Sequence, residues 1–312
     1  MASTILITGA NGSLAIPAVE YLLRAYPQHS LVLTVRNDSV KDHNTAELRR
    51  ILAQQPDAHV SIRVLDLASL EQVRVFSDTI LSEINDKALP RLSSVICNAM
   101  TWNLSGGPKY TSDGYEASIA VNYLAHFSLC LRLLSGMDNR ASPEAIQPRY
   151  RKSWTCWCIR NQTNKAKKQG EASRDMELVT IMVMYELNRR LKAKKDTEAI
   201  RAVAVDPLDL LDSRAFRQPH VPHHLQIMAR IVTWLLPLLR FVVPRLMKVE
   251  QAAGSVVEVA VAEKFSGQEG YFEGEQKVNS SPESMEMKMQ LALWRKSVEW
   301  CGLEQGETIV EL

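Results

Sequence analysis

TILITGANGSLA, residues 4–15, is an apolar run followed by a turn with two glycines and the start of a helical pattern. The apolar run predicts a buried strand, and Pro17 fits the first turn of a helix, where its missing amide hydrogen is harmless. Gly9 and Gly12 let backbone amides approach an anion, and the helix N-terminus favours negative charge. The stretch predicts a turn that binds a dinucleotide pyrophosphate; a tight turn needing glycines only for backbone geometry is the alternative.

Short apolar runs recur along the chain and alternate with longer stretches of helical periodicity. Strands buried on both faces have this composition, and strand–helix alternation with right-handed crossovers builds a parallel sheet. The runs lie at 5–8, 31–35, 60–65, 93–97 and 199–205, with a final short strand at 270–273. We expect an α/β protein with a doubly wound, Rossmann-like parallel sheet, folded as a single domain over residues 1–312.

The composition argues against several classes of protein. The 37 basic and 35 acidic residues nearly cancel to a net charge of +2, so we expect no nucleic acid as partner. Five cysteines are few and odd in number, which predicts no disulfide framework and a reducing compartment. The N-terminus shows no signal peptide, so we expect a cytoplasmic protein. Cys156 and Cys158 lack a second pair and a nearby histidine, so no metal site is expected.

The longest apolar stretch, 225–247, is interrupted by three arginines and two prolines. Its longest uncharged part, 231–239, is too short to span a bilayer, so we expect no stable membrane insertion. A cover over a small lipophilic substrate and ordinary core packing are the two interpretations of this stretch.

The residue after the second predicted strand bears on the choice of cofactor. An acidic residue there would bind the ribose hydroxyls of NAD, but the chain has Arg36, whose charge suits a 2′-phosphate. We therefore expect NADP as the cofactor, with NAD as the alternative. A solvated surface arginine is the other interpretation of Arg36.

On these motifs the chain resembles the short-chain dehydrogenase/reductase family, in particular members from fungal secondary metabolism. Residues 8–15 match the family's TGxxxGxG turn, except that Ala15 replaces the last glycine. Asp66-Leu67 matches the pair expected to contact adenine, and Asn98-Ala99 matches the centre of the NNAG motif. The cofactor-binding residues implied are Gly9, Asn11, Gly12, Ser13, Leu14, Arg36, Asp66, Leu67, Asn98 and Ala99.

The resemblance extends over nearly the whole chain except 136–176. Residues 113–116 and 121–124 resemble the family's long fourth helix, whose asparagine supports a proton relay through water. The resemblance gives this role to Asn122, and it also implies a homodimer or homotetramer.

Family chemistry uses a tyrosine as acid/base, a lysine four residues later that lowers the tyrosine's pKa, and a serine that binds the carbonyl. None of the eight tyrosines in the sequence is followed by a lysine at that spacing. Counting back from the matching segment at Tyr185, Ser173 stands at the tyrosine's position and Glu177 at the lysine's. Serine is far less acidic than a phenol, and a glutamate would oppose an anionic acid/base. Ser142 is the candidate for the catalytic serine.

The segment 136–176 breaks the regular pattern of the chain. Before Glu171 it carries eight basic residues against two acids, Asp138 and Glu144, and its compact apolar run lies at 154–159. We expect an irregular, solvated insert in place of a buried strand and the catalytic helix. A shifted reading frame, a mis-assigned exon and a decayed gene copy would each produce such a segment.

Two hypotheses for the function follow. The first is an NADP-dependent oxidoreductase acting on an alcohol or ketone of a lipophilic small molecule, with the resemblance implying fungal terpenoid or polyketide biosynthesis. The second is a catalytically silent dinucleotide-binding pseudoenzyme or defective gene product that lacks the YxxxK motif.

Overall fold

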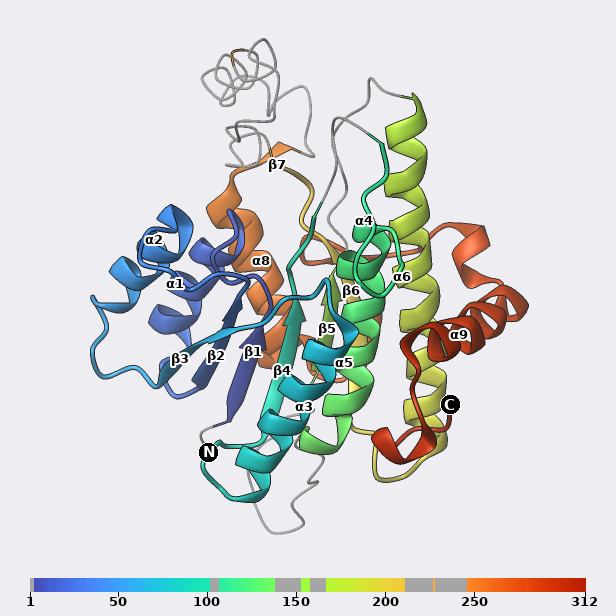
Figure 1. Cartoon of the computed structure of the whole chain (residues 1–312), viewed down its shortest axis with the longest axis horizontal. Helices are drawn as coiled ribbons and strands as arrows, with labels where there is room; N and C mark the ends of the chain where they lie inside the picture. The colour runs from blue at the N-terminus through green and yellow to red at the C-terminus, as the bar shows by residue number, and fades with distance from the viewer. Residues whose placement is uncertain (1–2, 102–106, 138–152, 158–166, 211–226, 228–245) are drawn as a thin grey trace.

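The main sheet of the protein has the strand order β10-β9-β6-β5-β4-β1-β2-β3 (Figure 1). All neighbouring strands are parallel except β10 and β9. The order runs outward from β1 in both directions, which confirms the doubly wound arrangement and brings the carboxyl ends of β1 and β4 side by side. The computed structural model describes residues 3–101, 107–137, 153–157, 167–210, 227 and 246–312.

The strands are short and apolar because helices cover both faces of the sheet, and all six runs singled out in the sequence are strands. The strands of the main sheet are β1 (Thr4–Ile7), β2 (Ser30–Val35), β3 (Val60–Val64), β4 (Leu92–Cys97), β5 (Ser153–Trp157), β6 (Arg201–Asp206), β9 (Gly270–Glu273) and β10 (Gln276–Val278). A separate two-stranded sheet consists of β7 (Asp209–Leu210) and β8 (Leu246–Met247).

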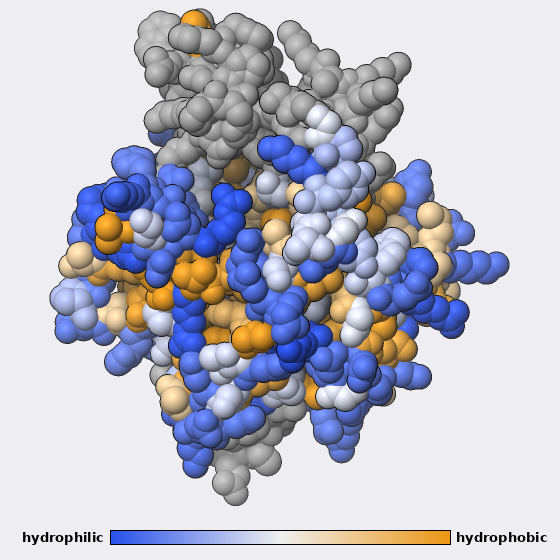
Figure 2. All heavy atoms as spheres, viewed as in Figure 1, coloured by the Kyte–Doolittle hydropathy of each residue, from blue (hydrophilic) through white to orange (hydrophobic). Residues whose placement is uncertain are grey.

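Two layers of helices enclose the sheet, each with its own apolar core (Figure 1). One layer contains α1 (Ala15–Ala25), α2 (His43–Leu52) and α8 (Val249–Val261). The other contains α3 (Leu70–Asn85), α5 (Ala125–Leu133), α6 (Lys167–Ala193) and α9 (Met287–Cys301). A short α4 (Ala117–Ile119) and a π-helical turn (Ala120–Leu124) lead into α5. Hydrophilic side chains cover most of the face in Figure 2, with apolar areas between them.

The helical stretch Ala117–Gly136 is long and apolar enough to cross a membrane by length and composition, and 72% of its most apolar window is buried. Phe127 and Leu131 of α5 belong to the core beside α3. Packing inside the protein therefore accounts for the composition of this stretch.

The expectation of an irregular insert over 136–176 is corrected by the structure for residues 153–157 and from Lys167 onward. Residues 153–157 form β5 in the middle of the sheet, paired with β4 and β6, and α6 begins at Lys167. Aromatic and β-branched residues such as Trp154 and Thr155 favour an extended backbone, but the charged flanks dominated the composition of the segment. Residues 138–152 and 158–166 lie outside the described part of the chain.

A central β5 predicts slow exchange of its backbone amides with solvent deuterium. The amides of 154–157 should exchange about as slowly as those of β4 and at least about tenfold more slowly than those of the edge strand β10. Hydrogen exchange followed by mass spectrometry of the matching peptides measures this. Exchange of residues 154–157 as fast as that of β10 would contradict the central position.

Candidate functional site

The turn after β1 brings the backbones of two strand ends into close approach. Gly9 has φ +60°, and a Cβ added to it would lie 2.8 Å from the Cα of Ala99. A Cβ added at Gly12 would lie 3.0 Å from the carbonyl oxygen of Gly9. Gly9 therefore requires glycine, and a side chain at Gly12 would crowd the carbonyl oxygen of Gly9.

The helix that follows this turn presents its N-terminus to the same edge of the sheet. Its N-cap residue, Leu14, makes no side-chain capping hydrogen bond, and the first turn of α1 contains no acidic residue. Helix N-termini of this kind bind anions through amide groups and the helix dipole. The residues from Gly9 to Leu14 therefore fit a pyrophosphate.

The hydroxyl of Thr8 joins the ends of β1 and β4 to α5. Its oxygen accepts hydrogen bonds from the amides of Asn98 (2.9 Å) and Ala99 (3.0 Å), and it lies 2.9 Å from Nε2 of His126. The side-chain amide of Asn98 donates to the carbonyl oxygens of Thr8 and Gly9, both at 2.9 Å. The sequence pointed to Asn98 and Ala99, whereas the roles of Thr8 and His126 became visible only in the structure.

The residues expected at the adenosine end lie along the carboxyl ends of β2 and β3. Arg36 is exposed directly after β2. Asn11 donates to Oγ1 of Thr45 at 2.9 Å, which ties the glycine turn to α2. Burial would raise the pKa of Asp42, but hydrogen bonds from Thr45 and Asn11 and the charge of Arg36 outweigh it and lower the pKa. The positive charge of Arg36 is therefore one of the influences that favour the carboxylate form of Asp42.

Asp66 and Leu67 follow β3, as the sequence predicts. Oδ1 of Asp66 accepts a hydrogen bond from the amide of Ala68 at 3.0 Å, and Leu67 is buried. The structure thus gathers all ten expected cofactor-binding residues at the carboxyl ends of β1 to β4, where doubly wound sheets bind their ligands.

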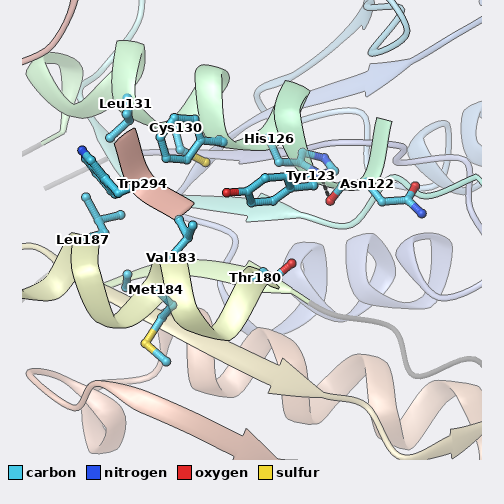
Figure 3. Close-up of a pocket in the computed structure, with 12 residues that line it drawn as sticks. Asn122, Tyr123, His126, Cys130, Leu131, Thr180, Val183, Met184, Leu187 and Trp294 are labelled. Atoms are coloured by element: carbon cyan, nitrogen blue, oxygen red, sulfur yellow. Dashed lines mark hydrogen bonds between the residues drawn. The ribbon is translucent and has the colours of Figure 1, made fainter. Parts of the chain in front are cut away.

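Asn122 lies in the π-helical turn before α5, a type of irregularity that is frequent at functional sites. Its side chain exchanges two hydrogen bonds with the backbone of Thr101, at 2.7 and 2.8 Å. Its backbone carbonyl lies 3.4 Å from Nδ1 of His126, at the edge of a cavity that α6 lines with Thr180 and Val183 (Figure 3). The amide side chain of Asn122 therefore positions the loop after β4.

The structure places Glu177, at the position expected for the catalytic lysine, beside a buried tyrosine. The hydroxyl of Tyr271 on β9 donates to Glu177 at 2.9 Å and lies 3.5 Å from Oδ2 of Asp206. Burial raises the pKa of Tyr271 well above its usual value, and the carboxylates of Asp206 and Glu177 raise it further. Ser173 lies in α6 but its side chain is outside the described part, and Ser142 lies outside the described residues.

The turn after β6 carries a leucine in a backbone conformation that is unusual for this residue. Leu208 has φ +67°, a left-handed conformation that glycine adopts without steric cost, and its amide donates to Oδ1 of Asp206 at 2.8 Å. The turn therefore keeps a backbone suited to glycine while carrying a side chain.

Two family models match different parts of the chain. The KR domain matches residues 3–125, and the AcuH dehydrogenase domain matches residues 214–310. The short-chain dehydrogenase iccH of Talaromyces variabilis is 25% identical, with 99% of this chain and 98% of the relative covered. Retinol dehydrogenase 14 of Homo sapiens is 29% identical, with 96% of this chain and 86% of the relative covered.

Solved structures share the fold over most of the chain. An NADPH-bound short chain oxidoreductase from Pseudomonas aeruginosa PAO1, described as containing an atypical catalytic center, superposes with a TM-score of 0.60 at 17% identity, covering 89% of this chain and 98% of that one. NADPH-bound carbonyl reductase from chicken fatty liver gives a TM-score of 0.58 at 15% identity, covering 90% and 99%. In its fold, and in sequence along almost its whole length, the chain is similar to members of the short-chain dehydrogenase/reductase family.

Proposed function

We propose that the chain is an NADP-dependent oxidoreductase that acts on an alcohol or ketone of a lipophilic small molecule in fungal terpenoid or polyketide biosynthesis. The observation that carries the proposal is the glycine turn at Gly9 and Gly12, held against the end of β4 by Asn98. The full-length similarity to the Talaromyces short-chain dehydrogenase supports the fungal setting. The apolar stretch 225–247, which supports the lipophilic substrate, lies largely outside the described residues.

Each part of the cofactor has residues of matching chemistry. The turn from Gly9 to Leu14 and the N-terminus of α1 would bind the pyrophosphate, Arg36 the 2′-phosphate, and Asp66-Leu67 the adenine. When bound, the nicotinamide would supply a hydride to a carbonyl or accept one from an alcohol. The NADPH in the structure of the chicken carbonyl reductase supports the choice of NADP.

A second candidate function is dinucleotide binding without catalysis. The specific observation is Glu177, an acid at the position expected for the lysine, engaged with Tyr271. Because its pKa is raised, Tyr271 stays protonated near neutral pH and is a weak proton donor, so we assign it a structural role. Binding can persist without turnover because the glycine turn and Glu177 lie on different elements of the fold.

The proposal also covers the cellular location and the oligomeric state of the protein. We propose a cytoplasmic location, which the few cysteines of the chain favour, and a homodimer or homotetramer, which the family resemblance implies. The described cysteines Cys97, Cys130 and Cys301 are buried thiols.

Arg36 should give the protein a preference for NADPH over NADH. Reversing its charge in Arg36→Asp should weaken NADPH binding at least about tenfold, through loss of a charge-assisted phosphate contact, and leave NADH binding nearly unchanged. Fluorescence titration with both cofactors measures this, with Arg295→Asp on the exposed side of α9 as the matched control. Equal affinities in the unmodified protein, or an unchanged preference in Arg36→Asp, would contradict the assignment.

Restoring the tyrosine and lysine should restore turnover if the register of α6 is right. The double variant Ser173→Tyr with Glu177→Lys should reduce carbonyl compounds at least about a hundredfold faster than the unmodified chain, the lower range for a general acid. Ser173→Phe with Glu177→Lys is the matched control without the phenol. Ordinary rates in the unmodified chain, or equal rates in the two double variants, would show that the acid/base lies elsewhere.

A further inference from the structure

The contacts of the Thr8 hydroxyl fix the protonation state of a buried histidine. A hydroxyl has one hydrogen to donate and two lone pairs that accept. The amides of Asn98 and Ala99 both donate to Oγ1 of Thr8, at 2.9 and 3.0 Å, and occupy these lone pairs. The third contact, 2.9 Å to Nε2 of His126, must therefore use the hydroxyl hydrogen. His126 then carries its own proton on Nδ1, which faces the carbonyl oxygen of Asn122.

The surroundings of His126 keep the ring neutral. Only 3% of the residue is exposed, and burial lowers its pKa to about 4, against an opposing effect of the Asn122 carbonyl. Among the described residues that line the adjoining cavity, the titratable groups besides His126 are the Tyr123 phenol and the Cys130 thiol, and α6 adds Thr180, Val183, Met184 and Leu187 (Figure 3). On the side of the sheet, the Cys97 thiol of β4 contacts Cys130.

We propose that His126 is a positioning residue for the dinucleotide site, because its neutral ring holds the Thr8 hydroxyl in the one orientation that fastens the end of β4 to the glycine turn. This inference rests on the proposed function as a dinucleotide-binding protein. His126 is not itself one of the expected cofactor contacts. It acts on the glycine turn indirectly, through Thr8 and Asn98, and it lies on α5, a helix that the sequence did not connect with that turn.

A protonated ring cannot keep this arrangement. Protonation puts a hydrogen on Nε2, so two donors would face each other across the 2.9 Å contact. Since the pKa of His126 is lower in the folded protein than its usual value near 6.5, the unfolded chain binds the proton first as the pH falls. The stability that this group contributes is fully present above pH 6.5 and is lost as the pH falls toward 4.

The experiment compares His126→Gln, whose side-chain oxygen can replace Nε2 as acceptor, with His126→Leu, which has no acceptor. NADPH affinity at pH 7.5 should stay within about threefold in the glutamine variant and fall about tenfold in the leucine variant, the effect of one lost buried hydrogen bond. His29→Gln, which removes the histidine bonded to Ser3, is the matched control and should bind like the unmodified protein. Equal affinity in the leucine variant would overturn the proposal.

Two readouts need no cofactor. Nitrogen NMR of histidine-labelled protein, assigned by the signal lost in His126→Gln, should show the proton on Nδ1; a proton on Nε2 would overturn the proposal even if His126→Leu failed to fold. Between pH 7.5 and 5, the unfolding equilibrium constant of the unmodified protein should rise about thirtyfold more than that of His126→Gln. An equal rise would overturn it too. If the unmodified protein binds no NADPH while these readouts hold, the proposed function fails and the histidine contact stands.

Discussion

One hydroxyl group joins three elements of this fold. Oγ1 of Thr8 accepts hydrogen bonds from two backbone amides at the end of β4 and contacts the ring of His126 on α5. Because the one hydrogen and both lone pairs of the hydroxyl are engaged, each of these groups depends on the others for its position. The glycine turn lies so close to the end of β4 that a Cβ at position 9 would collide with Ala99. The arrangement of the backbone at the candidate cofactor site therefore depends on the contacts of the Thr8 hydroxyl.

Much of the fold could be predicted from the sequence, because apolar runs such as 31–35 and 93–97 become strands buried on both faces. The glycine turn could also be predicted from the sequence, because its residues act through the local backbone. β5 was missed, because charged flanks outweighed its few apolar residues. The bond between Thr8 and His126 spans 118 positions, and no local pattern connects two residues so far apart. The left-handed Leu208 was also hidden, since leucine does not predict such a backbone.

The two halves of the candidate site are built from different strands and helices. The cofactor half depends on β1, β4 and α1, whose glycines and asparagine match the family. The other half depends on α6, where Glu177 contacts Tyr271 of β9, and on α9, whose buried Trp294 packs edge-on against Phe127. Substitutions in α6 therefore need not disturb the glycine turn. Because of this separation, the site is compatible with both proposed functions, an oxidoreductase and a silent dinucleotide-binding protein.

The central claim is that the Thr8 hydroxyl organises the dinucleotide site, and a pair of substitutions at this residue tests it most directly. Thr8→Val keeps the shape of the side chain but removes the group that satisfies two amides and His126, whereas Thr8→Ser keeps the hydroxyl. Calorimetric titration with NADPH should show binding weakened at least about tenfold in the valine variant and nearly unchanged in the serine variant. A valine variant that binds as tightly as the unmodified protein would contradict the account.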